Sequence, residues 1–153
     1  MLKKRSEKTL KHKPGVAVAI VYRKKVLLLR RHNIPFISNP GIWSLLTGGI
    51  EKNEAPLDTA YREVFEETRI DKKRLSLLRG PLEAILTDAV RKKGRWLNAF
   101  YVFRSSTHAV KLSLENSAYR WADISELENE RRYTNIFMNA NEIMKALKSA
   151  IDE

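Results

Sequence analysis

The stretch GGIEKNEAPLDTAYREVFEETRI, from Gly48 to Ile70, places five glutamates within the 17 residues from Glu51 to Glu67. The chain as a whole is basic, because 29 Lys and Arg residues against 18 Asp and Glu residues give a formal charge of +11 at pH 7. A basic chain that gathers so many of its acids in one segment is expected to use them locally.

This segment predicts a helix from Pro56 to about Thr68, since proline is well tolerated at the first helical position. Apolar or small side chains recur every three or four residues and predict the core-facing side, at Leu57, Ala60, Val64 and Thr68. Glu63, Glu66 and Glu67 lie at i, i+3 and i+4, so we expect their carboxylates to converge beside the buried face.

Three convergent carboxylates repel one another by a few tenths of a kcal/mol per pair, a cost that a lysine among them would remove. They become useful when a cation lies between them. Mg²⁺ takes oxygen ligands and is often held by carboxylates together with phosphate oxygens. On the three acids alone, a merely solvated acidic face is the simpler interpretation.

The neighbouring residues favour a metal site over a solvated acidic face. The pattern G-x5-E-x7-R-E-U-x-E-E-x-G-U, in which U is apolar, is matched by Gly48, Glu54, Arg62, Glu63, Val64, Glu66, Glu67 and Ile70. It resembles the signature of the Nudix hydrolases, the MutT-like family. At average residue frequencies, six charged or glycine positions match by chance with odds on the order of one in 10⁵. The flanking sequence extends the resemblance loosely from about residue 14 to 150.

The resemblance implies an α/β protein, a Nudix-type α/β/α sandwich with a mixed β-sheet, at residues 14–153, preceded by a basic N-terminal arm at residues 1–13. It also implies a metal-dependent hydrolase with Mg²⁺ or Mn²⁺ as cofactor. Such an enzyme cleaves the diphosphate linkage of a nucleoside diphosphate linked to another moiety: an NTP or oxidised NTP, a dinucleoside polyphosphate or a nucleotide sugar.

Carried over by position, the resemblance implies that Glu63, Glu66 and Glu67 are metal ligands and that the backbone carbonyl of Thr47 joins them. A bound divalent cation would neutralise the charge of a diphosphate and lower the pKa of bound water. The surrounding positive charge would attract the polyphosphate, which the carboxylates alone would repel.

The resemblance further implies an ion pair between Arg62 and Glu54 that locks the loop to the helix, with a water-mediated metal contact as a second role for Glu54. The general base stays open between Glu66, the first choice within the motif, and Glu115, which precedes a later strand. Asn141 in the last helix is a weak candidate for contacting a nucleobase.

Arg69 stands where the motif has its last glycine. Glycine there normally ends the helix in the left-handed conformation. That conformation costs a non-glycine residue at the same position roughly 1 kcal/mol. Either Arg69 accepts that strain or the helix end is remodelled, so Arg69 concerns helix termination rather than the chemistry.

Outside the motif, hydrophobic patterning predicts strands followed by an amphipathic helix. The strands are expected at 15–22, 26–31, 43–46, 75–78, 83–87, 95–104 and 119–122, and the helix at about 135–151. The first two strands are expected to form a hairpin, and the proline-containing residues 32–42 an irregular loop.

The chain has no cysteine, and its apolar runs are too short to span a bilayer, so we expect a cytoplasmic protein with no membrane contact. A sequence pI near 10 favours anionic partners, which makes a nucleotide the expected partner. RNA is allowed but not required, and so is a homodimer. The alternative function is a non-catalytic nucleotide- or RNA-binding module on a Nudix scaffold, and an enzyme acting on capped RNA lies between the two.

Overall fold

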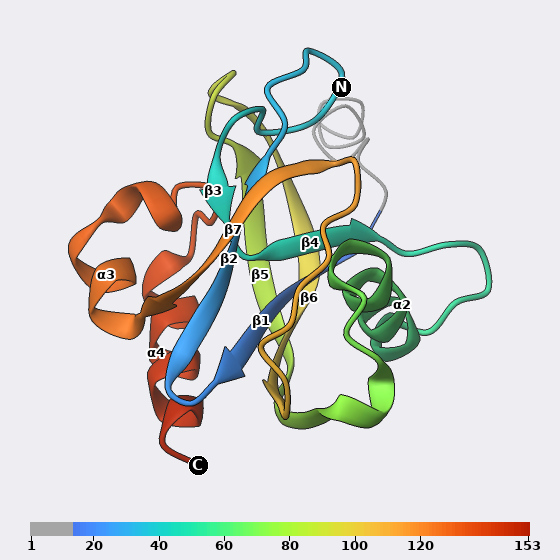
Figure 1. The fold of residues 1–153 in the computed structure, drawn as a ribbon. Coiled ribbons are helices and arrows are strands. Elements are labelled where there is room, and N and C mark those ends of the chain that lie inside the picture. The colour runs from blue at the N-terminus through green and yellow to red at the C-terminus, as the bar shows by residue number, and fades with distance from the viewer. Residues whose placement is uncertain (1–13) are drawn as a thin grey trace.

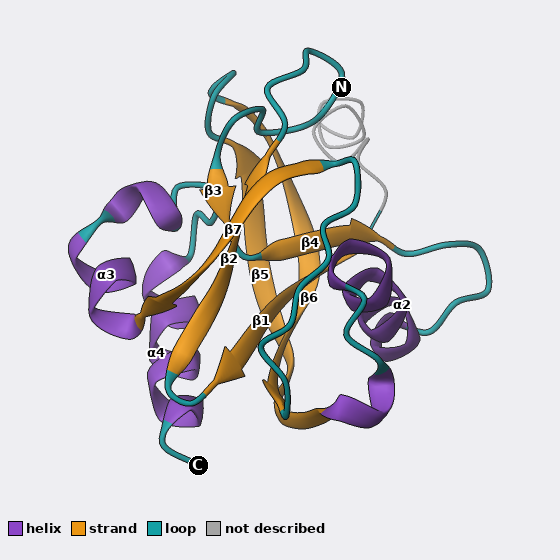
Figure 2. Ribbon diagram, in the orientation of Figure 1, coloured by secondary structure: helices purple, strands orange, loops and turns teal. Residues whose placement is uncertain are grey.

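The computed structural model describes residues 14–153, so the basic arm expected at residues 1–13 lies outside the described residues. The elements are β1 (Gly15–Tyr22), β2 (Lys25–Arg31), β3 (Trp43–Ser44), β4 (Leu46–Gly49), α2 (Pro56–Thr68), the 3-10 turn η1 (Lys72–Arg74), β5 (Leu75–Asp88), β6 (Lys93–Ser105), β7 (Asn116–Asp123), α3 (Ile124–Asn129), the 3-10 turn η2 (Arg131–Tyr133) and α4 (Ala140–Ile151). Helix α2 covers one side of the strands, and α3 and α4 cover the other (Figure 1, Figure 2). The expected α/β/α sandwich is confirmed.

The strands form one seven-stranded mixed sheet in the order β3-β2-β1-β6-β5, with β4 added to β1 and β7 added to β2. Strand β1 runs parallel to β6 and antiparallel to both β4 and β2. The pairing with β4 covers residues 15–18 of β1, whereas that with β2 covers only Val21 and Tyr22. The start of β1 therefore lies between β6 and the glycines of β4.

Both faces of β1 are buried, which explains its uninterrupted apolar sequence. Because side chains alternate along a strand, Ala17 and Ala19 join the core cluster on the side of α3 and α4. Val16 and Val18 join the cluster that includes Ala60 of α2. The core is thus two layers separated by the sheet. Within residues 14–153, no helix is long and apolar enough to cross a membrane.

The expected hairpin is present, with a tighter turn than the sequence indicated. Arg23 and Lys24 have φ values of 46° and 66°, and Lys25 already belongs to β2, where it pairs with Tyr22. Two successive positive φ values match the right-handed twist of the flanking strands. The two segments expected at 75–78 and 83–87 form a single strand, β5.

The last helix begins at Ala140, not at about residue 135 as the sequence indicated. The preceding residues instead follow the edge of β5: Thr87 N donates to Ile136 O at 2.8 Å, and Met138 N donates to Ile85 O at 2.7 Å. Asn139 continues this pairing with its side chain, accepting from Ile85 N at 2.9 Å. The segment therefore covers part of an edge strand that would otherwise stay unpaired.

Helix α3 was not expected from the sequence, yet it has a sequence signal. Asp123 and Glu126 form a capping box at its start, in which each side chain pairs with backbone of the other residue. The spacing D-x-x-E before a helix is typical of this motif. The helix is only six residues long, too short for a clear apolar period.

Candidate active site

Arg62 fastens α2 to the loop that precedes it. Its Nε donates to Glu54 Oε2 at 2.7 Å, and its Nη2 donates to Glu54 Oε1 and to Gly49 O, both at 2.9 Å. Thr59 Oγ1 also donates to Glu54 Oε1, at 2.7 Å. Hydrogen bonding from Arg62 and then from Thr59 lowers the pKa of Glu54 to about 2. The structure thus contains the ion pair that the resemblance implied.

The same guanidinium holds two of the implied metal ligands. Nη1 of Arg62 donates to Glu63 Oε1 at 2.9 Å and to Glu66 Oε2 at 3.1 Å. The Glu63 side chain is 12% exposed and the Glu66 side chain 52% exposed. Burial raises the pKa of Glu63 to about 7, even though Arg62 opposes the shift. Glu63 therefore faces inward while Glu66 stands at the surface.

Glu67 is the most buried acid of the helix. Its Oε1 accepts a hydrogen bond from Asn116 Nδ2 at 2.9 Å, while its Oε2 is buried without a partner among residues 14–153. Burial raises the pKa of Glu67 to about 8, with the Asn116 hydrogen bond acting in the opposite direction. Asn116 begins β7, and no local sequence pattern indicated its role, because it lies 49 residues from its partner.

Two glycines bring the backbone against these acids. A Cβ placed on Gly48 would lie 2.2 Å from Glu63 Cδ, and one placed on Gly15 would lie 2.5 Å from Gly48 O. No side chain fits at either position without moving its neighbours. The glycine of the motif thus serves a close approach, which leaves the β4 backbone open toward the acid cluster.

A pocket of about 270 Å³ lies between these glycines, the start of β6 and the loop before β7. Thr47, Gly48, Glu63 and Glu115 all line it. The structure therefore brings Glu115 together with the loop and with an implied metal ligand, although 52 residues separate Glu115 from Glu63. Glu66 does not line this pocket and instead lies beside Arg62.

Arg31, at the end of β2, also lines the pocket and was not singled out by the sequence. Its Nε donates to Ser38 O at 2.6 Å, which ties the loop of residues 32–42 to the strand. Asn39 N donates to Asp88 Oδ2 at 3.2 Å, and Arg91 Nη1 donates to the same oxygen at 2.8 Å. The loop of residues 32–42, which forms one wall of the pocket, is thus hydrogen-bonded to the β5–β6 hairpin.

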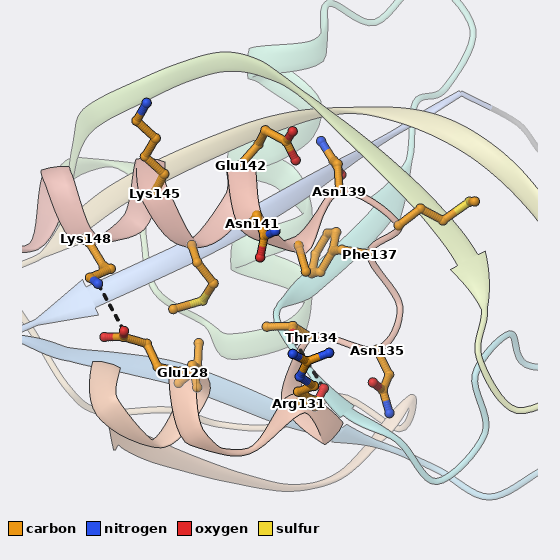
Figure 3. A pocket seen from close by; sticks show the side chains of 14 residues that line it. Glu128, Arg131, Thr134, Asn135, Phe137, Asn139, Asn141, Glu142, Lys145 and Lys148 are labelled. Atoms are coloured by element: carbon orange, nitrogen blue, oxygen red, sulfur yellow. Dashed lines mark hydrogen bonds and ion pairs between the residues drawn. The ribbon is translucent and has the colours of Figure 1, made fainter.

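Asn141 lies elsewhere. It lines a second hollow of about 860 Å³ on the side of α3 and α4, together with Glu128 and Lys148, which pair at 3.0 Å. Figure 3 shows this hollow, with Asn141 and Lys145 on the same helix. The structure therefore does not bring Asn141 together with the acids of α2.

The donor set of the acid cluster fits a hard divalent cation: carboxylate oxygens next to a glycine-rich backbone. The unpartnered Oε2 of buried Glu67 is an acceptor that a cation would satisfy. In the arrangement described for residues 14–153, however, no group of three or more acidic or histidine side chains is placed to hold a metal ion. Glu63 Oε1 and Glu66 Oε2 instead pair with Arg62, each through one oxygen of its carboxylate.

Known proteins resemble this chain in sequence and in fold. A family model described as the NUDIX domain matches residues 11–141. The bis(5'-nucleosyl)-tetraphosphatase (asymmetrical) of Rattus norvegicus is 30% identical over 118 residues, which cover 66% of this chain and 78% of the rat protein.

Solved structures show the same fold. A C. elegans Ap4A hydrolase binary complex matches with a TM-score of 0.65 and 20% identity, covering 88% of this chain and 93% of that one. The E. coli dihydroneopterin triphosphate pyrophosphohydrolase matches with a TM-score of 0.66 and 22% identity, covering 94% and 99%.

Proposed function

The chain belongs to the Nudix family and is a Nudix pyrophosphohydrolase, and from this premise we propose that it cleaves the diphosphate linkage of a nucleoside diphosphate joined to another moiety. A dinucleoside polyphosphate is the first substrate to test, because a relative of 30% identity is named for acting on one. NTPs, oxidised NTPs and nucleotide sugars carry the same linkage and are the other members of the class.

One observation carries the proposal: Glu63 of α2, the glycine backbone of β4 and Glu115 line a single pocket. Nudix hydrolases generally use divalent metal ions, and here Glu63, Glu66 and Glu67, with the Thr47 carbonyl, would hold Mg²⁺ or Mn²⁺. The bound cation would supply charge neutralisation at the diphosphate and a more acidic water.

The chain's own residues account for the rest of the site. Arg62 keeps Glu54, Gly49 and α2 in one rigid unit, so that the acids and the glycine backbone keep a fixed separation. Gly48 lets the Glu63 carboxylate pack directly against the β4 backbone. Glu115 lines the pocket, whereas Glu66 lies outside it beside Arg62, and one of the two would accept the proton of the attacking water.

The test is chromatographic analysis of the products formed from a nucleotide panel in Mg²⁺, Mn²⁺ or EDTA. NTPs would release pyrophosphate, whereas the other members would give two phosphorylated fragments. The panel contains dinucleoside polyphosphates, canonical and oxidised NTPs, ADP-ribose and nucleotide sugars. We expect turnover of one class that EDTA abolishes. No turnover of any member by folded protein would refute the proposal and favour a nucleotide- or RNA-binding module.

Single substitutions test the residues. We expect Glu67→Gln to lower turnover by about 10²- to 10⁴-fold, because it removes the charge of an implied metal ligand. Comparing Glu115→Gln with Glu66→Gln identifies the base, since only the variant of the true base loses the acidic limb of the pH–rate profile, where the rate rises as the base deprotonates. Near-normal activity in both Glu66→Gln and Glu67→Gln would refute the assigned site.

A further inference from the structure

Asn98 is an unusual residue for its position on β6. Trp96, Asn98, Phe100 and Val102 alternate along the strand and so face the same side of the sheet. The three apolar members belong to the core cluster beneath α3 and α4. Asn98 is only 6% exposed, and its Oδ1 is buried with no hydrogen-bond partner among residues 14–153.

Stability does not explain an asparagine here. A buried acceptor without a partner lowers the stability of the fold by about 1–3 kcal/mol. An apolar side chain of similar shape at this position would carry no such penalty, because it has no acceptor to leave unpaired. The fold nevertheless makes room for the amide. Gly15 lies against it, because a Cβ there would be 3.1 Å from Asn98 Oδ1 and 3.2 Å from Nδ2.

The amide also lies at the candidate active site. Asn98 lines the same pocket as Gly48, Glu63 and Glu115. In the sheet, Asn98 pairs with Gly15, and Gly15 pairs with Gly49 on its other edge. The amide is therefore one strand away from the glycine backbone of β4 and lines the same pocket.

The chemistry of the free oxygen limits what it can bind. A carboxamide oxygen only accepts hydrogen bonds. Ionised phosphate oxygens are acceptors too, so they cannot satisfy it. The nucleoside end, in contrast, carries O–H groups on the ribose and N–H groups on the base.

We propose that Asn98 is a substrate-binding residue that accepts a hydrogen bond from a donor group of the nucleoside, either a ribose hydroxyl or a base amino group. This assignment rests on the proposed function and adds to it a residue that selects among nucleosides. A site that hydrogen-bonds a donor discriminates against the analogue lacking that donor, because the buried acceptor is then left unpaired.

The test uses nucleoside monophosphates, which have no diphosphate linkage to cleave, and measures their binding by calorimetry in EDTA. Wild type and Asn98→Leu are compared on each parent nucleotide and on analogues lacking one donor: 2'-deoxy and 3'-deoxy sugars, and bases without the exocyclic amino group. Asn98→Leu is expected to weaken binding of the parent about fivefold, from one neutral hydrogen bond. An analogue that wild type and Asn98→Leu bind with equal affinity lacks the group that donates to Asn98. That analogue therefore shows whether the donor belongs to the ribose or to the base.

Thermal unfolding separates binding from a structural role. Asn98→Leu should unfold at the same temperature as wild type or higher, and Asn129→Leu, at an exposed asparagine, should change neither unfolding nor binding. A lower unfolding temperature for Asn98→Leu would overturn the proposal, as would wild-type affinity of this variant for every nucleotide or failure of wild type to bind any. Because these measurements need no turnover, they stay informative even if the nucleotide panel shows none.

Discussion

At the scale of single residues, the surroundings of each glutamate decide what it can do. Glu54 is hydrogen-bonded by Arg62 and stays ionised, with its pKa lowered to about 2. Glu67 is buried in the same small region, and burial raises its pKa to about 8. One residue type thus supplies a permanent anion that pairs with Arg62 and a carboxylate whose charge depends on pH and which would bind a cation.

The raised pKa of Glu67 predicts how the metal-free protein responds to pH. A folded-state pKa of about 8 against an ordinary 4.5 means that Glu67 contributes stability below pH 4.5, which is lost as pH rises toward 8. Glu63, with a pKa raised to about 7, acts in the same direction. In EDTA, we expect the unfolding temperature to fall between pH 5 and pH 8.5.

Glu67→Gln should flatten this fall, because the amide stays neutral across the range. Part of the fall should persist, since Glu63 still ionises. Differential scanning calorimetry of both proteins at half-unit pH steps measures the effect. Parallel curves for wild type and Glu67→Gln would show that Glu67 does not titrate in this range.

At the scale of elements, the junction between the glycine loop and α2 depends on the shape of the Arg62 guanidinium. It donates from Nε and Nη2 to both oxygens of Glu54 and also reaches the Gly49 carbonyl. A lysine has no planar fork and cannot reproduce these contacts. We expect Arg62→Lys to lower the free energy of unfolding by about 2 kcal/mol, the scale of hydrogen bonds to charged groups.

Urea unfolding of Arg62→Lys measures this loss. Arg132→Lys is the control for a more exposed arginine: Arg132 pairs with Glu130 at 2.6 Å and donates to Tyr133 Oη at 3.0 Å, so we expect a loss of about 1 kcal/mol. Equal effects of the two substitutions would mean that the loop and helix are held together by other contacts.

The end of α2 shows how the fold accommodates a missing glycine. Arg69 takes the left-handed conformation, with φ of 63°, and its N–H still donates to Phe65 O. Its guanidinium lies 5.2 Å from the centre of the Phe65 ring, which offsets part of the strain. The helix ends as the motif requires, so Arg69 accepts the strain.

Arg69→Gly should therefore raise the free energy of unfolding by about 0.5 kcal/mol. Relief of the left-handed strain stabilises the variant, and loss of the contact with the Phe65 ring offsets part of that gain. Arg69→Ala keeps the strain and loses the ring contact, so it should be less stable than wild type. Urea unfolding of the three proteins gives this order, and both variants should keep wild-type turnover. A destabilised Arg69→Gly would contradict the strain argument.

At the scale of the whole molecule, charge is distributed unequally. The chain carries a net charge of +11, yet the acids that would hold the cation lie together beside one pocket. A basic surface raises the local concentration of a polyphosphate, and salt screens that attraction over a Debye length of about 10 Å at 0.1 M.

We therefore expect KM for a dinucleoside polyphosphate to rise several-fold between about 0.05 and 0.5 M KCl, with little change in kcat. A substrate with fewer negative charges, such as ADP-ribose, should show a shallower dependence. Steady-state kinetics in fixed Mg²⁺ at each salt concentration tests this. A KM independent of salt would mean that the net charge plays no part in substrate capture.

The sequence by itself determined what depends on short-range spacing. It predicted α2 from Pro56 to Thr68 and contains the motif whose resemblance to the family implied the pairing of Arg62 with Glu54, because these residues lie within one helix and its adjoining loop. The buried strands β1 and β6 were equally predictable from their apolar runs. Helix α3 and the late start of α4 were not, because short elements and edge pairing leave little periodic signal.

Only the tertiary structure decided which distant residues join the acids. Asn116 reaches Glu67 because β7 pairs with β2, and Asn98 reaches the glycine backbone because β6 runs parallel to β1. Glu115 enters the pocket and Asn141 lies apart from it for the same reason. Strand register is set by packing across the whole sheet, so no local pattern in the sequence specifies which polar side chains meet at the site.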